Sequence, residues 1–240
     1  WGLLSGLDIA PPYLLPSPWT VLQTGYEYMF ADPGSGPYAG RFTSDAVASL
    51  GRVLAGFGLA AAFGIPLGLF SGRSSLFRDF ISGFLNAVRA VPGIAWLPLA
   101  LVWLGIGFKT TVFLVALAGF FPIYLSTASA VRQVDPLLLR AGAMLGFGRI
   151  RSTLQILVPA AMGPIMSGLR LGLGIAFAYL VLGELTGVPN GLGAVIMDAR
   201  LLGRVDMIIV GLLLIAIIGR MSDLILVGIL RISLKSARRI

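Results

Sequence analysis

The stretch TTVFLVALAGFFPIYLSTASAV, which runs from Thr110 to Val131, decides the fold class because it contains no charged residue. A helix needs about 20 mostly apolar residues to cross a hydrocarbon core about 30 Å thick, and this stretch is long enough. It therefore predicts a membrane-spanning helix, and the sequence on both sides of it has the same character.

The composition of the whole chain also indicates a membrane protein. Of its 240 residues, 57% are hydrophobic and only 12% are charged, and the mean hydropathy is +0.94. The charged side chains are clustered, and one soluble core could not hide the long uncharged runs between them. The sequence therefore predicts an all-α, polytopic membrane protein.

Five candidate spans follow from the hydropathy pattern. Each is judged against the length that crosses a bilayer at about 1.5 Å rise per residue. The second is interrupted by Arg89, Pro92 and Pro98, and we expect it to bend or break where the prolines remove backbone donors. The five spans are Ser44–Ser71, Ile81–Gly107, Thr110–Val131, Pro159–Gly187 and Met207–Leu230.

Residues 1–43 form a proline-rich arm that precedes the membrane domain, residues 44–240. Prolines and glycines prevent one continuous helix in this arm. A short helix over Trp19–Phe30 is expected after Pro18, because proline favours a helix start. The abrupt start at Trp1, without an initiator methionine, leads us to expect an upstream span.

The charges of the connections predict how the chain is oriented. Connections on one side carry a net charge of +8 and those on the other side −2. Because cytoplasmic loops are rich in Lys and Arg, the positive side and the C-terminus are expected in the cytoplasm. This use of the basic residues also argues against a nucleic-acid partner. The positive connections are residues 71–80, 132–158 and 231–240, and the opposite ones are residues 1–45, Lys109 and residues 188–206.

The residue types exclude most catalytic chemistry. The sequence has no Cys and no His, which removes thiolate nucleophiles, histidine acid–base catalysis and zinc sites with Cys or His ligands. In the nearest match to a phosphate-binding loop, Gly105–Thr110, Phe108 stands where glycine must let the backbone wrap the phosphates. We expect no catalytic residue, metal or cofactor in this chain, so ATP and Mg²⁺ would be bound by a partner ATPase.

Residues 135–159, DPLLLRAGAMLGFGRIRSTLQILVP, form a less hydrophobic segment between the third and fourth spans. Asp135 followed by Pro136 is typical of a helix start, and Gly146 and Gly148 are expected to end that helix. A short helix with small residues and apolar anchors suits insertion into a groove on another protein. An amphipathic connection on the lipid surface is the alternative, and periodicity does not decide between the two.

The spacing of this segment resembles the EAA loop in permease subunits of bacterial ATP-binding-cassette (ABC) importers. That loop reads E-A-A, three residues, Gly, nine residues and I-x-L-P, and Ala141, Gly146, Ile156 and Pro159 match it. Arg140 departs from the pattern because it stands where the family usually has Glu, which would reverse the sign of a salt bridge to the ATPase. The resemblance assigns ATPase coupling to Leu139, Arg140, Ala141, Gly142, Met144, Leu145 and Gly146.

Ordered blocks along nearly the whole chain resemble one branch of these permeases, from sulfonate, taurine, nitrate and bicarbonate importers. The resemblance implies the type I ABC importer permease fold with six spans, the first of them missing here. It also implies a paired permease, expected as a homodimer in the bacterial inner membrane, with two ATPase subunits and a periplasmic binding protein. The blocks are Leu14–Leu22, Ser49–Leu69, Val88–Gly107, Phe120–Ala141 and Gly191–Ala199.

Ionisable residues within the spans are candidates for the pathway, because burying each costs roughly 2.5–3.5 kcal/mol on insertion scales. Arg89 precedes the break and would suit an anionic substrate, or it snorkels to the cytoplasmic side. Glu184 belongs to an outer gate or caps a neighbouring helix. Arg170 lines the pathway or anchors its helix, and the structural interpretation is favoured. Arg220 and Asp223 are expected to neutralise each other.

Two further sets of residues have a packing interpretation and a functional one. Aromatic side chains would pack in the bundle or form a constriction of the pathway, and they are Phe120, Phe121, Tyr124 and Tyr179. Small residues at four-residue spacing let helices approach closely, either within one bundle or between two copies. They are Ala60, Gly64, Gly68 and Gly72 in the first span and Gly168, Gly172 and Ala176 in the fourth.

These features predict the transmembrane subunit of an ATP-driven importer for a small, anionic solute. The main alternative is an ion-gradient-driven carrier or channel, which would need intramembrane carboxylates for coupling. Only Glu184 and Asp223 are available for that role, and both lie near span ends. A membrane-embedded enzyme is disfavoured because the chain lacks His, Cys and clustered carboxylates.

Overall fold

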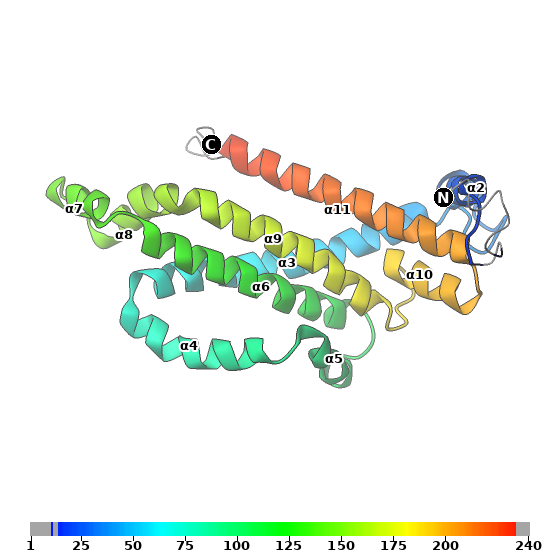
Figure 1. Ribbon diagram of the computed structural model, residues 1–240, viewed down its shortest axis with the longest axis horizontal. Coiled ribbons are helices and arrows are strands. Elements are labelled where there is room, and N and C mark those ends of the chain that lie inside the picture. Colours follow the sequence, from blue (N-terminus) through cyan, green and yellow to red (C-terminus); the bar gives the residue numbers. More distant parts are fainter. Residues whose placement is uncertain (1–10, 12–13, 234–240) are drawn as a thin grey trace.

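A computed structural model describes residue 11 and residues 14–233, without the side chains of residues 231–233. The described residues form helices joined by short connections, with no strand among them (Figure 1). Several charges used to predict the orientation lie outside these residues, namely Asp8, Lys235, Arg238 and Arg239. The helices are α2 (Pro18–Phe30), α3 (Phe42–Arg73), α4 (Ser75–Ala90), η1 (Gly93–Trp96), α5 (Leu97–Leu104), α6 (Phe108–Gln133), α7 (Pro136–Met144), α8 (Arg149–Ser152), the π-helical turn η2 (Thr153–Leu157), α9 (Val158–Glu184), α10 (Leu192–Leu201) and α11 (Val205–Ser233).

The predicted spans correspond to long helices of the structure. Among the described residues, four helical stretches are long and apolar enough to cross a membrane, over Phe42–Arg73, Phe108–Gln133, Arg149–Glu184 and Val205–Leu230. The pair Ser75–Ala90 and Gly93–Leu104 passes the same test and is bent by 86° at the break between its two parts. Five spans with a broken second one, as the sequence predicted, are therefore confirmed when this bent pair counts as one span.

Helix α6 lies at the centre of the bundle, between α3 and α9. Small residues permit this packing, because a Cβ added at Gly68 would lie 2.6 Å from Thr127 Cβ, and one added at Gly72 would lie 2.5 Å from Val131 Cβ. On the other side of α6, a Cβ at Gly168 would overlap the Ser126 side chain. The small-residue stripes therefore face α6 within one chain, which is the packing interpretation made from the sequence.

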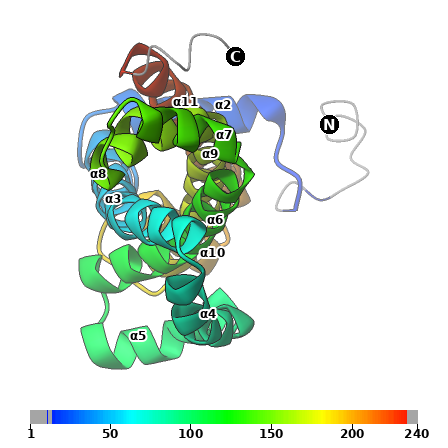
Figure 2. The same ribbon diagram turned by 90° about the vertical axis from the view of Figure 1, so that its left-hand side faces the viewer.

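The remaining helices lie on opposite sides and at opposite ends of this central layer. Helix α11 runs along one side, whereas α4 and α5 lie on the other (Figures 1 and 2). Helices α7 and α8 occupy one end of the molecule, and α2 and α10 the other (Figure 1). The bundle core therefore lies between two ends that are built from different short helices.

The predicted helix in the arm is present as α2. Its N-cap Ser17 accepts a hydrogen bond from Thr20 N over 3.1 Å, and Pro18 occupies the first helical position. Tyr28 on its buried face packs with α10 and α11 in a second, smaller core. The arm is thus attached to the bundle at this end.

Candidate functional site

Helix α7 forms the exposed tip at one end of the bundle, where sequence reasoning put the coupling segment. The Asp135 carboxylate caps its first turn by accepting a hydrogen bond from Leu137 N over 2.8 Å, and Pro136 follows as its first residue. The local sequence therefore starts this helix without help from the rest of the fold.

The end of α7 is equally well defined. Gly146 has a φ of +77°, and the N–H groups of Gly146 and Phe147 bond to Ala143 O and Gly142 O over 3.0 Å each. These two bonds are those of a Schellman cap, in which a left-handed residue ends the helix. The backbone conformation, and not crowding, therefore explains the glycine at this position, because a Cβ on Gly146 would meet no atom within 4 Å.

Gly142 holds α7 against the returning chain. It is buried, and an added Cβ would overlap Ile156 Cδ1 of η2. The Arg151 guanidinium lies over the Phe147 ring, 4.3 Å from its centroid, and stabilises the turn between α7 and α8. Two residues that match the loop pattern, Gly146 and Ile156, therefore set the shape of the segment.

The outer surface of α7 carries apolar side chains that no described residue covers. Met144 is 89% exposed and Leu145 75% exposed. Arg140 and Ala141 are also exposed, and Arg140 makes no hydrogen bond or ion pair with any residue in the described part. Leu139 is half-buried and lines a groove of about 940 Å³ between this segment and the ends of α3 and α4. A fixed helix with bare apolar anchors is a surface suited to a protein partner.

The candidate pathway residues do not form one cluster. Arg89 is exposed in the last turn of α4, before the break. Beyond the break, Gly93 lies so close to Tyr179 that an added Cβ would overlap the phenol oxygen. The structure thus joins the broken span to α9 at Tyr179, while Arg89 has no ion pair within the described residues.

Three aromatic candidates are grouped on α6. Phe120 stacks on Tyr124 with a centroid distance of 5.7 Å and meets Phe121 edge-on at 5.2 Å. Tyr124 is buried, and its hydroxyl is 2.9 Å from Ser71 Oγ on α3. Tyr124 therefore has the contacts of a packing residue, whereas Phe120 and Phe121 are half-buried.

Glu184 belongs to a buried polar network at the end of the bundle opposite α7. Its side chain is fully buried, and Oε1 lies 2.6 Å from Arg52 Nη1. Oε2 accepts a hydrogen bond from Gly193 N in the first turn of α10 over 2.8 Å, and Ser49 donates to both oxygens. Helix capping, one of the two alternatives for Glu184, therefore describes its contacts.

The same network binds three successive N–H groups at the start of α10, those of Gly191, Leu192 and Gly193. Gly191 N donates to Asp45 Oδ1 and Leu192 N to Ser49 Oγ, each over 2.9 Å. Tyr28 donates to Asp45 over 3.0 Å, and burial together with the Asp45 carboxylate raises the pKa of this phenol, which therefore keeps its proton. Helices α2, α3, α9 and α10 are thus joined by side chains far apart in the sequence.

A second charged group connects α9 and α11. Arg170 binds the Asp223 carboxylate with two hydrogen bonds, Nε to Oδ1 over 2.8 Å and Nη2 to Oδ2 over 2.9 Å. Arg220 Nη1 adds a third at 3.0 Å. The predicted pair of Arg220 and Asp223 is therefore present, and Arg170 from another helix adds a two-pronged bond to the same carboxylate that the sequence did not predict.

Comparison with known proteins identifies the family. The profile of the family described as "binding-protein-dependent transport system inner membrane component" matches residues 64–239. The chain belongs to this family of permeases. The chain is 31% identical over 223 residues, 93% of its length, to the putative aliphatic sulfonates transport permease protein SsuC of Bacillus subtilis, and covers 78% of that protein. It is 32% identical over 224 residues, again 93% of its length, to the taurine transport system permease protein TauC of Escherichia coli, and covers 80% of that protein.

The fold of this permease is also found in a solved structure. The MetNI methionine ABC transporter in an inward-facing conformation contains a chain that aligns with a TM-score of 0.68. The alignment covers 82% of the permease and 98% of that chain at 20% identity, which supports the fold alone. The predicted type I importer permease fold is therefore confirmed.

Family membership establishes the coarse function. The chain is a multi-pass inner-membrane permease of a binding-protein-dependent ABC importer, and it is a non-catalytic component that needs no cofactor of its own. Its family implies partners that bind the substrate and hydrolyse ATP. Among the described residues, no group of three or more acidic side chains could hold a metal ion.

Sequence reasoning missed the partners of the intramembrane charges. Arg52 and Glu184 are 132 positions apart and Arg170 and Asp223 are 53 apart, so local spacing could not pair them. The available signal was the balance of charges within the spans, because each buried carboxylate needs a cation. Sequence spacing alone favoured the nearer pair, Arg220 with Asp223.

Proposed function

We propose that this permease forms the translocation pathway for a small anionic solute of the sulfonate, taurine, nitrate or bicarbonate class, delivered by a periplasmic binding protein. The observation that carries the proposal is the similarity over 93% of the chain to permeases named for aliphatic sulfonates and for taurine. Both kinds of solute carry a sulfonate group. A shared anionic group is the simplest common requirement for such a pathway.

In this proposal the segment over residues 135–159 docks on the ATPase in the cytoplasm. The bare anchors Met144 and Leu145 would enter a groove of the ATPase, while the Schellman cap at Gly146 fixes their direction. Arg140 would meet an acidic side chain, because it replaces the usual glutamate. The C-terminus lies on the same side of the membrane, and the arm over residues 1–43 lies outside.

Transport then follows from movement of a rigid bundle. Two permease copies form the pathway, and ATP binding draws the two ATPase subunits together. Helix α7, fixed to the bundle through Gly142 and Ile156, would carry its own copy with it. Arg89, Phe120, Phe121 and Tyr179 remain candidates for side chains that line the moving pathway, and Glu184 for its outer gate.

An ion-gradient-driven mechanism has less support in the structure. Both intramembrane carboxylates considered for ion coupling already bind arginines, Glu184 through Arg52 and Asp223 through Arg170. A carboxylate that already binds a guanidinium is not free to bind a coupling cation. We therefore assign the energy source to ATP.

Uptake by reconstituted vesicles tests this function. The permease, its ATPase and its binding protein would be placed in proteoliposomes with ATP, and uptake of taurine, an alkanesulfonate and nitrate would be compared with uptake of methionine and lysine. We expect ATP-dependent uptake of at least one anion of this class and none of the other two solutes. Uptake of only methionine or lysine would contradict the assignment.

A further inference from the structure

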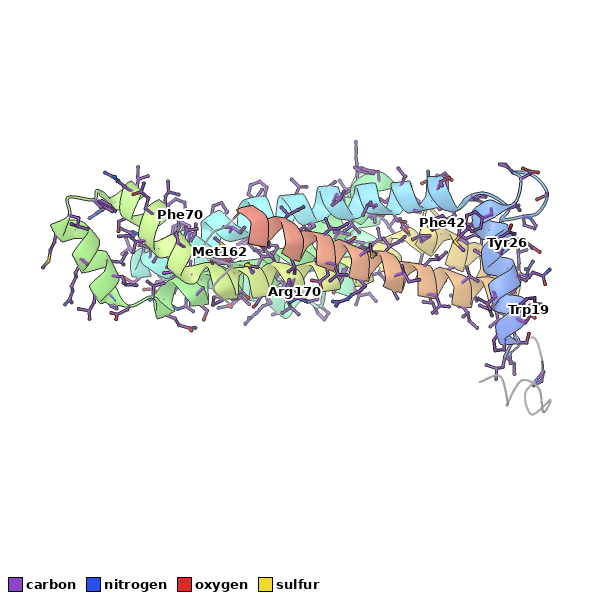
Figure 3. All side chains as sticks on the ribbon, turned by 90° about the horizontal axis from the view of Figure 1, so that it is seen from above. Trp19, Tyr26, Phe42, Phe70, Met162 and Arg170 are labelled. Atoms are coloured by element: carbon purple, nitrogen blue, oxygen red, sulfur yellow. The ribbon has the colours of Figure 1, made fainter. Side chains whose placement is uncertain are left out.

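The groove of about 940 Å³ beside α7 is built from two parts of the chain that lie far apart in the sequence. One wall is the end of α3 with its turn into α4, and the other consists of residues from α7, α8 and η2. Figure 3 places Phe70 of the first wall toward the end of the molecule that carries α7. This one chain therefore forms both walls without a second copy.

Two arginines, one on each wall, give the groove a positive charge. Arg73 is the last residue of α3, and Arg149 is the first residue of α8. Neither guanidinium makes a hydrogen bond or an ion pair with another residue in the described part of the chain, and no acidic side chain is among the described lining residues. The other lining residues are mainly apolar. A ligand with a negative charge and an apolar part would match both features.

The charged and apolar side chains of the groove are separated by depth. Helix α3 has 32 residues and is about 48 Å long, enough to reach the headgroups on both sides of a bilayer that is about 40–45 Å thick with them. Pro66 lies seven positions before Arg73, which is about 10 Å deeper and at the edge of the hydrocarbon. In the other wall Arg149 begins a membrane-spanning stretch, and Leu154 follows five positions later. Both walls are thus charged at the membrane surface and apolar below it.

An anionic phospholipid has the same division, with a negative headgroup at the surface and acyl chains below. In the proposed orientation this end is cytoplasmic, where anionic lipids give the leaflet a negative surface potential and basic pockets between membrane helices bind their headgroups. A segment of the ATPase is the other occupant to consider, but it would have to enter the hydrocarbon to reach Pro66 and Leu154. A lipid accounts for both the charge and the depth of the groove.

We infer that an anionic phospholipid of the cytoplasmic leaflet binds in this groove, with its headgroup between Arg73 and Arg149. An acyl chain lies against Pro66 and Leu154. Because Leu139 of α7 lines the same groove, the lipid connects the coupling segment with the end of α3. The inference rests on the cytoplasmic placement of this end in the proposed function, and it is independent of the transported solute.

Lipid binding to the full-length permease tests this site. Native mass spectrometry in detergent would compare phosphatidylglycerol, which is anionic, with phosphatidylcholine, which has no net charge. We expect the wild type to bind phosphatidylglycerol at least about tenfold more tightly. Arg73→Gln combined with Arg149→Gln should bring the two affinities to within about threefold, because the headgroup loses both cations. As a matched control, Arg132→Gln removes a cation from the last turn of α6, outside the groove, and should keep the preference.

A second variant tests the apolar part of the groove without changing a charge. Leu154 is 62% exposed, so Leu154→Trp should still fold while its larger ring fills the space of an acyl chain. We expect the affinity for phosphatidylglycerol to fall at least about threefold, a loss that Leu213→Trp on α11, outside the groove, should not show. Equal effects of the two tryptophan variants would overturn the site. An unchanged lipid preference in the double arginine variant, or equal binding of both lipids by the wild type, would overturn it as well.

The ATPase and an uptake measurement complete the test. Phosphatidylglycerol should stay bound when the ATPase binds the permease, and its displacement would show that a protein segment occupies the groove instead. If the wild type has the expected lipid preference but transports no anion, the proposed function fails and the lipid site stands. Anion transport by a permease without this preference would refute the lipid site alone.

Discussion

At the scale of single residues, the end of α7 depends on one backbone conformation. Gly146 has a φ of +77°, which is unfavourable for a β-branched residue. Gly146→Val should introduce strain of about 1–3 kcal/mol and reorient the anchors Met144 and Leu145. We expect substrate-stimulated ATPase activity and uptake to fall while the permease still folds, as measured in reconstituted vesicles and by size-exclusion chromatography.

The neighbouring glycine provides a control for this variant. Gly148 has an ordinary φ of −66°, and a Cβ there would meet no atom within 4 Å. Gly148→Val should therefore leave uptake close to that of the wild type. If the two valine variants behave alike, the cap at Gly146 has no special part in coupling.

The buried pair of Arg52 and Glu184 contributes to stability. Glu184→Gln would leave the guanidinium of Arg52 buried without its carboxylate, which typically costs about 3–5 kcal/mol. We expect a clear drop in the unfolding temperature of the purified permease in detergent. Asp79→Asn in the exposed pair with Arg78 should change stability by no more than about 1 kcal/mol.

A double variant tests whether Arg52 and Glu184 stabilise the permease as a pair. Arg52→Met together with Glu184→Gln removes both charges, and it should be more stable than Glu184→Gln alone. A double variant that loses the sum of both single effects would show that the two side chains do not act together.

The structural role of a residue was predictable from the sequence where it depends on residues a few positions away. It was not predictable where it depends on a contact between helices far apart in the sequence. The cap at Asp135 and the stop at Gly146 follow from residues a few positions apart. By contrast, Glu184 receives Arg52 and Ser49 from α3 only after the bundle has formed. A charge count indicates that Glu184 needs a cation, but helix packing selects which one.

At the scale of helices, the approach of α3 to α6 depends on side chains that are absent. A Cβ at Gly68 would lie 2.6 Å from Thr127 Cβ and 2.9 Å from the Tyr124 carbonyl oxygen. Gly68→Val should therefore force the two helices apart and destabilise the permease by about 1–3 kcal/mol or more. The measurement is thermal unfolding in detergent.

Another glycine of α3 tests whether the position matters. Gly58 lies on the same helix, and a Cβ there would meet no atom within 4 Å. Gly58→Val should leave the unfolding temperature close to that of the wild type. Equal destabilisation by both variants would mean that helix propensity, rather than the approach of α6, is what the glycines provide.

The spans were predictable as elements, but their neighbours were not. Uncharged runs and prolines predicted long helices and a broken second span, which has the 86° bend between α4 and α5. The sequence did not indicate that α6 lies between α3 and α9, because small-residue stripes fit contacts within a chain or between copies equally well. Only the three-dimensional arrangement decides between these two kinds of contact.

At the scale of the whole molecule, the two ends have opposite character. One end is tied together by the polar network around Glu184, and the other presents the bare apolar surface of α7. A bundle held firmly between them can transmit movement from a motor at one end to a gate at the other. The central claim is that α7 is the contact with the ATPase on the cytoplasmic side.

Chemical labelling of Met144→Cys tests this claim most directly, because the chain has no native cysteine. A membrane-impermeant maleimide should label this cysteine in inside-out vesicles stripped of the ATPase, and rebinding of the ATPase should block the reaction. Trp19→Cys on α2, exposed at the opposite end (Figure 3), should react only from the outside. Labelling of Met144→Cys from the outside, or labelling that the ATPase does not reduce, would contradict the account.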